Sequence, residues 1–562
     1  MTTLDIVFFV GFVLFVVGFA MFMSRKEKDS TDYFLAGRAA TWPLIGFSLI
    51  AANISTEQFV GMSGAGAGNA GLAIASYEWI AAITLVCVAI FFLPRFLRAG
   101  IFTIPEYLEY RYNTTARLIM SFFLLLMFVF VTTVAVVYSG GVTLDTFFGK
   151  HIYPLVGEVT LVKGIWMIGV VAVVYTAFGG LKAVLWADLV QGSALILGGA
   201  VVTLFALRAI GGWGAAMQYP EVSGKMHMVL PATHPELPWT ILVLGIWIPN
   251  FYYWGLNQYI TQRTLAARTL REGQLGVIFA AALKLIIPFV IVIPGIIAPA
   301  LFREKLHISM ETAVDQAYPL LIRELIGEGW RGFVLAALAG AVISSLASML
   351  NSASTIFTMD IYKRLLSPNA SQKSLVWLGR VLTIIFMIVA CTLAPTLADP
   401  RFGGVFKFIQ EFQGLFSPGI LAAFVFGFAV PRAPAMAGIA GMISCPIIYS
   451  AMKWPVGWIL QSKYTFLTAE TKAGEVFAGL GAAPGGFDRA LGYLYDMAFL
   501  NRMGITFILV LLVMGVITAA APLKQPVTMP VNQDFDMKPS RSVFTLGLAV
   551  VVVTLGLYVV FW

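Results

Sequence analysis

Long apolar segments recur from the start of the chain to its end. Each is about 20 residues long, the length that an α-helix needs to cross a hydrocarbon core of about 30 Å, and we count about fourteen of them. Only 11% of the 562 residues are charged and 59% are hydrophobic, which is too little charge to cover a water-soluble protein of this size. The sequence therefore predicts an all-α polytopic membrane protein. A nucleic-acid partner is not expected, because the net charge of +8 is dispersed over short loops.

The first apolar segment, residues 5–23, has no basic residue before it and is followed by Arg25, Lys26 and Lys28. A cleaved signal peptide has the reverse order, so we expect this helix to be retained and the N-terminus to lie outside. Basic residues then concentrate in alternate connections, such as residues 263–271, which the positive-inside rule places in the cytoplasm. With an even number of spans the C-terminus also lies outside. We expect an integral, multi-pass protein of the plasma membrane, which in a bacterium is the inner membrane.

Two apolar segments carry polar or helix-breaking residues at their centres. The first is interrupted near residues 51–55, and the second, Ile248–Tyr259, contains Pro249 and Gly255. Two broken segments at corresponding positions of two halves indicate an inverted-repeat secondary transporter, in which unwound backbone lines a substrate cavity. The alternative is that Pro249 and Gly255 merely kink an ordinary membrane helix.

Ionisable residues at membrane depth are costly and usually mark a transport pathway or an ion pair. Four such residues stand out: Glu57, Glu78, Asp188 and Lys284. Glu78 and Lys284 have opposite charges, so we expect them to share one polar cavity that binds hydroxyl groups. A purely structural ion pair is the alternative for these two residues, and an interfacial cap is the alternative for Asp188.

A later apolar segment is rich in hydroxyl groups. Ser344, Ser345, Ser348 and Ser352 are spaced so that several share one helix face. Such residues often serve only to let membrane helices pack closely. A monovalent cation, however, needs a cage of oxygen atoms, which these hydroxyls and the unwound carbonyls of the first broken segment would provide. A sodium site between the two segments and close helix packing are thus both consistent with the pattern.

The chain also contains the stretches TDYFLAGR, SLIAANISTEQFVGMSG, IASYEW, YYWGLNQYITQRTLAAR, FAAALKLIIPF and AVISSLASMLNSASTIFTMDIY. These stretches resemble the sodium:solute symporter family, and specifically its sugar branch, which includes sodium/glucose cotransporters and bacterial sodium/galactose symporters. The resemblance extends from the first helix to about Gly441. It implies a single transmembrane domain, residues 1–562, of LeuT-type fold with a five-plus-five inverted repeat. The repeats would occupy residues 42–207 and 238–430, with an extra helix at 5–23 and additional C-terminal helices at 431–562.

The resemblance also implies specific roles for individual residues. The sodium ligands would be Ala51, Ile54, Ala341, Ser344 and Ser345, with Asp188 near the sodium exit path. The sugar hydroxyls would be bound by Gln58, Glu78, Asn250, Lys284 and Gln410. The gates would be formed by Asn53, Met62, Tyr77, Tyr253 and Phe406. Ala81 departs from the pattern, because similar bacterial sugar symporters have a serine there, and this leaves the identity of the hexose open.

We therefore expect a protein that is not an enzyme, needs no organic cofactor, and imports a galactose-like or glucose-like sugar together with sodium by alternating access. Its expected partners are the monosaccharide, the sodium ion and the lipid bilayer, and its oligomeric state is left open. Other solutes of the same family, such as myo-inositol or sialic acid, are alternatives. So are coupling to a proton carried by Glu57 or Asp188, and a transporter-like membrane sensor.

Overall fold

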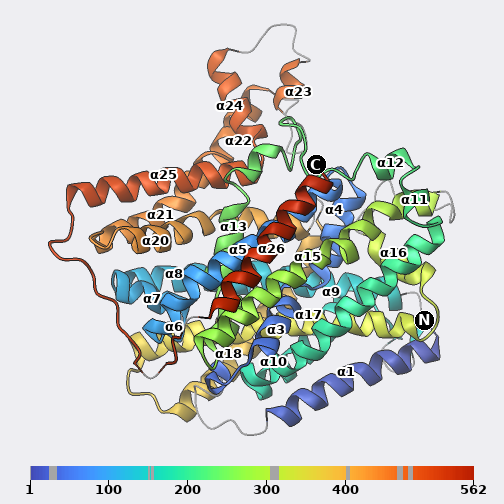
Figure 1. The fold of residues 1–562 in the computed structure, drawn as a ribbon, viewed down its shortest axis with the longest axis horizontal. Helices are drawn as coiled ribbons and strands as arrows, with labels where there is room; N and C mark the ends of the chain where they lie inside the picture. The colour runs from blue at the N-terminus through green and yellow to red at the C-terminus, as the bar shows by residue number, and fades with distance from the viewer. Residues whose placement is uncertain are drawn as a thin grey trace.

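The computed structural model describes residues 2–24, 34–149, 152–153, 157–303, 316–399, 405–464, 473–478, 485–533, 535–538 and 540–562. These residues form an almost entirely helical molecule (Figure 1). A short antiparallel strand pair, β1 (Ile152–Tyr153) and β2 (Gly157–Glu158), joins Ile152 to Glu158. The all-α prediction is therefore confirmed.

The helical elements follow one another through the whole described chain. In order they are α1 (Thr3–Met23), η1 (Ala36–Arg38), α3 (Trp42–Asn53), η2 (Glu57–Met62), α4 (Ser63–Ala67), η3 (Gly71–Ala75), α5 (Ser76–Cys87), η4 (Val88–Phe92), α6 (Leu93–Ala99), α7 (Ile104–Arg111), α8 (Thr114–Met127), η5 (Phe128–Thr132), α9 (Thr133–Phe148), α10 (Leu161–Ile210), α11 (Trp213–Ala216), α12 (Pro220–Ser223), η6 (Trp239–Leu242), α13 (Trp247–Leu256), α14 (Gln258–Leu265), α15 (Leu270–Leu301), α16 (Ala317–Leu325), α17 (Trp330–Thr355), η9 (Ile356–Leu366), α18 (Gln372–Leu393), η10 (Ala394–Ala398), α19 (Val405–Gly414), α20 (Ser417–Ala429), α21 (Ala435–Ala451), α22 (Trp454–Lys463), α23 (Ala473–Ala478), α24 (Gly486–Asp496), α25 (Phe499–Ala520) and α26 (Arg541–Val560).

Within the described residues, ten helices are long and apolar enough to cross a membrane. The count reaches eleven if α19 and α20, which are bent by 45° at Gly414–Ser417, form one span. The 50-residue helix α10 is itself divided at Gly180, whose φ of 52° and ψ of −166° are not helical. Glycine tolerates this backbone conformation because it has no Cβ. Several apolar segments of the sequence are thus bent or broken helices.

Both predicted breaks are present. Helix α3 ends at Asn53, because Ile54 adopts an extended conformation with φ −91° and ψ 103°, and the chain resumes helical structure at η2. Helix α13 ends at Leu256, and Asn257, with φ −77° and ψ 121°, separates it from α14. The second break therefore does not lie at Pro249 or Gly255, as the sequence suggested. Pro249 sits in the first turn of α13, where backbone N–H groups have no intrahelical partner to lose.

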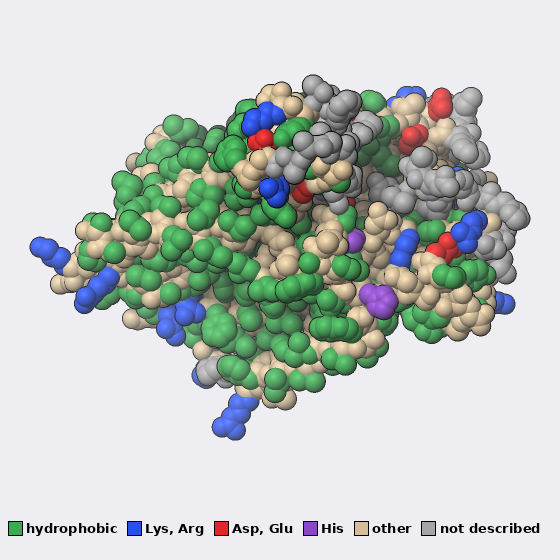
Figure 2. Space-filling model, turned by 90° about the horizontal axis from the view of Figure 1, so that it is seen from above, with side chains coloured by type: hydrophobic (Ala, Val, Ile, Leu, Met, Phe, Trp, Pro, Cys, Tyr) green, Lys and Arg blue, Asp and Glu red, His purple; other side chains and the backbone are tan. Residues whose placement is uncertain are grey.

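The helices pack as a bundle around a central group that includes α3, α10, α15 and α17. Helix α26 crosses in front of α5 and α15, and α20, α21 and α25 stack together at one side (Figure 1). The helices α22, α23 and α24 project beyond the bundle. Hydrophobic side chains cover the left and central parts of the face in Figure 2, whereas Lys, Arg, Asp, Glu and His side chains gather in its upper and right-hand parts and further Lys and Arg lie at its left and lower edges. This distribution is expected where the surroundings are lipid.

Candidate functional site

A cavity lies beside both helix breaks. The volume that the centre of a water molecule can reach inside it is about 90 Å³. All five predicted substrate contacts line it, each from a different element: Gln58 of η2, Glu78 of α5, Asn250 of α13, Lys284 of α15 and Gln410 of α19. Residues far apart in the sequence thus meet at one site, beside the unwound backbone that the pattern predicted.

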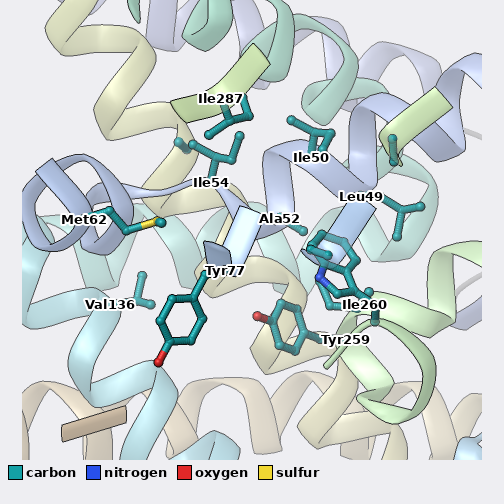
Figure 3. Close-up of a cluster of buried hydrophobic side chains, with 14 of the residues drawn as sticks. Leu49, Ile50, Ala52, Ile54, Met62, Tyr77, Val136, Tyr259, Ile260 and Ile287 are labelled. Carbon is teal, nitrogen blue, oxygen red and sulfur yellow. The ribbon is translucent and has the colours of Figure 1, made fainter. Parts of the chain in front are cut away.

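The predicted gates Asn53, Met62, Tyr77 and Tyr253 line the same cavity. Figure 3 shows Met62 and Val136 near Tyr77, with Tyr259 across the space from it. Phe406 belongs to α19, but its side chain lies outside the described residues, as does that of Glu57. Ala81 is buried and is not among the described residues that line the cavity.

Glu78 and Lys284 form an ion pair in the cavity wall. Lys284 Nζ donates to Glu78 Oε2 and also to Asn53 Oδ1, and the side chains are only 1% and 4% exposed for Lys284 and Glu78. The ammonium lies 4.8 Å from the centroid of the Trp254 ring, a favourable cation–π contact. Because each charge is compensated by the other, the cavity presents polar groups without a net charge from this pair.

Tyr253 is held at the cavity by two polar contacts. Asn53 Nδ2 donates to Tyr253 Oη over 3.0 Å, and Tyr259 Oη donates to the same oxygen. The rings of Tyr253 and Tyr259 meet edge to face with centroids 5.6 Å apart. The contact expected from the resemblance, Asn53 steadying Tyr253, is present, and it ties the end of α3 to α13.

The cavity amides have different hydrogen-bonding states. Gln58 Oε1 accepts from the Ser55 backbone N–H over 3.2 Å, and Asn250 Nδ2 donates to the Ile246 carbonyl over 2.9 Å. Gln410 Oε1 has no partner among the described residues. An amide carries both donor and acceptor groups, so these side chains retain capacity to bind the hydroxyls of a ligand.

The five predicted sodium ligands lie on α17 and at the broken end of α3. Ala51 and Ile54 flank the break, where the last carbonyls of a helix lack intrahelical partners. On α17, Ser345 Oγ donates to the Ala52 carbonyl over 3.1 Å, so the two elements touch at this point. Backbone carbonyls and hydroxyls are ligands suited to a monovalent cation.

Asp188 lies in the interior of α10 and is fully buried, so it is not an interfacial cap. It accepts from Arg263 Nη2 over 3.1 Å and from the hydroxyls of Ser48 and Ser344. The predicted connection of residues 263–271 begins later than expected, because Arg263 belongs to α14 and is 1% exposed. The sequence shows that Arg263 belongs to a cluster of basic residues. It does not show that Arg263 pairs with the buried carboxylate of Asp188.

A second buried ionic cluster, around Asp360 and Arg117, was not predicted from the sequence. Asp360 of η9 accepts from Arg117 Nε over 3.0 Å, from Ser121 Oγ over 3.0 Å and from Thr103 Oγ1 over 2.8 Å. Arg117 also pairs with Glu109, whose Oε2 lies 2.6 Å from Arg117 Nη1. Asp360 stands in the hydroxyl-rich stretch of the sequence, and its position inside an apolar segment was an available signal. The cluster joins η9 to α7 and α8.

Comparisons with known proteins agree with this architecture. The family model described as the sodium:solute symporter family matches residues 33–445. A sodium/glucose cotransporter of Vibrio parahaemolyticus is 42% identical over 78% of this chain and 83% of its own length. An uncharacterized symporter, YidK, of Escherichia coli K12 is 33% identical over 99% of this chain and 91% of its own length.

Among solved structures, a Na⁺-coupled sialic acid symporter in a substrate-bound, outward-open state superposes with a TM-score of 0.73. The two chains are 21% identical, and the match covers 94% of this chain and 99% of the other, so the likeness concerns the fold. The family match covers most of the sequence, including every element that contributes to the cavity. This multi-pass membrane protein is a transporter, not an enzyme, and it belongs to the sodium:solute symporter family.

Proposed function

We propose that the protein is a sodium-coupled symporter that imports a neutral monosaccharide of the hexose class by alternating access. The observation that carries this proposal is the convergence of Gln58, Glu78, Asn250, Lys284 and Gln410 on one cavity. The name of the Vibrio relative, a sodium/glucose cotransporter, supports the same substrate class. A ring of amide, carboxylate and ammonium groups suits a ligand with hydroxyls on every side, because each hydroxyl both donates and accepts.

The charge of the cavity favours a neutral sugar over an acidic one. Lys284 is the cationic side chain among the described cavity residues, and Glu78 neutralises it. A carboxylate such as that of sialic acid would therefore have to compete with Glu78 for the ammonium. Myo-inositol, a neutral polyol, remains an alternative substrate and is included in the test below.

Coupling is proposed to arise where the broken end of α3 meets α17. Sodium bound by Ala51, Ile54, Ala341, Ser344 and Ser345 would hold these two elements together, and the α3 break also carries Asn53, which contacts both Lys284 and Tyr253. Sodium and sugar would then favour the same occluded state, which is a reciprocal free-energy linkage. Loss of sodium would release the α3 break and with it the contact that steadies Tyr253. Asp188, next to Ser344, would lie on the sodium exit path.

We also propose fourteen spans in the five-plus-five arrangement, with repeats at residues 42–207 and 238–430. Three of the proposed spans are not among the ten long apolar helices: α3 with η2 and α4, α13 with α14, and the first part of α10, Leu161–Val174, which Gly180 separates from the second part. With α19 and α20 as one span, this division accounts for fourteen. We propose that both termini lie outside, which for a bacterial protein is the periplasmic face of the inner membrane.

The test is uptake of radiolabelled galactose, glucose and myo-inositol into proteoliposomes, with and without an inward sodium gradient at fixed pH. Sodium-dependent accumulation is expected for a hexose. Ser345→Ala is expected to weaken the sodium dependence, whereas Ser444→Ala is the matched control, because Ser444 in α21 donates only over 3.2 Å to Gly441 of its own helix. Gln58→Ala is expected to weaken sugar uptake, with Gln461→Ala in α22 as its control.

The outcomes separate the alternatives. Accumulation driven by a pH gradient without sodium would replace sodium by a proton and direct attention to Asp188. Sodium-dependent uptake of sialic acid, but not of hexoses, would overturn the neutral-sugar assignment. Stoichiometric binding of solute without accumulation in the vesicles would favour a membrane sensor.

A further inference from the structure

Asn257, the residue at the second helix break, is in the N-cap position of α14. Asparagine is favoured there because its side-chain oxygen normally accepts a hydrogen bond from the second or third backbone N–H of the helix. In this protein the side chain of Asn257 makes no such bond. The backbone carbonyl of Asn257 instead accepts from Ile260 N over 3.2 Å and from Thr261 N over 2.9 Å. The amide is thus not used to stabilise the helix that it begins.

The amide of Asn257 also lacks the usual compensation for burial. The residue is 4% exposed, and its Oδ1 has no hydrogen-bond partner among the residues that the structure describes. A buried polar atom left in this state is costly, and each case in a native protein needs an explanation. Asn257 lines the cavity, so a ligand there is within reach of its side chain. Gln410, a predicted sugar contact, shows the same combination of a cavity position and an unpartnered oxygen.

The position of Asn257 relative to Tyr253 indicates when such a contact would form. Asn257 follows Tyr253 by four residues and begins α14, which leads away from the break towards Ala267. There the chain meets the segment that leads into α3: Ala40 N donates to the Ala266 carbonyl, and Arg268 N donates to the Ala40 carbonyl, both over 3.0 Å. In the proposed topology this meeting point is cytoplasmic. Asn257 therefore lies on the inner side of Tyr253, together with Tyr259, another cavity residue.

We infer that Asn257 is a substrate-contact residue, which receives the hydroxyl groups of the sugar on the inner side of Tyr253. This inference rests on the proposed function and adds one residue to the proposed site. An amide can donate to one hydroxyl and accept from a neighbouring one, as a sugar carrying adjacent hydroxyls requires. When the sugar leaves its contacts around Glu78, Asn257 provides a hydrogen-bonding partner on the inner side. The sugar hydroxyls therefore do not lose all their polar contacts at this step.

The first experiment compares the wild-type protein and Asn257→Ala with the transported sugar and with its series of monodeoxy analogues. One analogue, lacking the contacted hydroxyl, is expected to lower kcat/KM of the wild type by roughly three- to tenfold, the effect of losing one neutral hydrogen bond. Asn257→Ala is expected to show that loss with the parent sugar and no further loss with that analogue. The melting temperature of Asn257→Ala should equal that of the wild type, because the side chain makes no cap bond. Asn257→Ser, which retains a hydroxyl, should recover part of the transport.

The second experiment does not require turnover. On a background without cysteine, made by replacing Cys87, Cys391 and Cys445, Asn257→Cys is treated with a small thiol reagent with and without sugar. The sugar is expected to slow the modification at position 257 several-fold. Ser462→Cys on the exposed surface of α22 is the control, whose modification the sugar should not change.

Three results would overturn the inference. Unchanged kinetics of Asn257→Ala would mean that water alone satisfies the amide. If Asn257→Ala and every deoxy analogue lowered kcat/KM independently, so that their effects multiply, Asn257 would lie outside the substrate path. The same would follow if a sugar that the cysteine-free protein transports did not slow the modification of position 257. In these cases the proposed symport would stand. Failure of the cysteine-free and wild-type proteins to transport any solute would instead remove the proposed function, and this inference with it.

Discussion

The ion pair between Glu78 and Lys284 allows a quantitative test of the cavity. Substitution Glu78→Gln keeps the shape of the side chain but leaves the Lys284 ammonium buried without its counter-charge. Removing one partner of a buried pair costs about 3–5 kcal/mol, because the remaining charge is uncompensated. Two contacts of the ammonium survive, with Asn53 Oδ1 and with the Trp254 ring. We therefore expect a loss near the lower end, about 3 kcal/mol.

The double variant Glu78→Gln with Lys284→Met removes both charges at nearly constant volume. Replacing a buried ion pair by uncharged groups is often neutral or stabilising. The double variant should therefore be more stable than Glu78→Gln alone, with a coupling energy of about 2 kcal/mol or more. Both proteins should fail to transport sugar, because the polar groups proposed to bind it are altered.

The assay measures the apparent melting temperature of the purified proteins in detergent, from the fraction of protein that stays monodisperse after heating. Sugar uptake in proteoliposomes is measured alongside. The expected order of melting temperatures is Glu78→Gln below the double variant, with the double variant close to the wild type. A Glu78→Gln protein as stable as the wild type would refute the reasoning, since it would mean that the ammonium does not depend on the carboxylate. A double variant no more stable than the single one would refute it equally.

Three further predictions concern sodium, the gate and pH. Ser345→Ala should raise the sodium concentration for half-maximal uptake roughly tenfold, the effect of about 1.4 kcal/mol of lost ligand energy, as measured by uptake against sodium concentration; an unchanged value would remove Ser345 from the site. Tyr253→Phe deletes the oxygen that accepts from Asn53 over 3.0 Å, so sugar efflux from loaded vesicles should accelerate by a few-fold, whereas unchanged or slower efflux would contradict a gating role. Burial raises the pKa of Glu109, but hydrogen bonds from Arg117, Thr114 and Arg364 lower it more, so that the net pKa lies below its ordinary value of 4.5. The stabilisation that ionised Glu109 contributes to the folded protein is therefore complete above about pH 5 and declines as the pH falls through the lowered pKa. Melting temperatures measured from pH 7 to 4 should fall more steeply for the wild type than for Glu109→Gln. Parallel curves for the two proteins would disprove this linkage.

Much of the cavity was predictable from the sequence because lipid makes polar residues conspicuous. Glu78 and Lys284 stand out in apolar segments, and their opposite charges are enough to predict a shared cavity. The structure pairs them. The resemblance of the surrounding stretches to a known family then identified the amides Gln58, Asn250 and Gln410, which line the same space. Their roles in binding stay predictions until transport is measured.

The sequence by itself determined that the chain is a helical membrane protein with two interrupted segments, because the length and apolarity of each segment are local properties. Where the second interruption lies was decided by tertiary structure: Pro249 fits the first turn of α13, and the break is at Asn257. The same holds for Arg263, which its local sequence places in a loop. Only the folded protein brings it to Asp188, because that contact joins residues 75 positions apart and depends on how α10 and α14 pack.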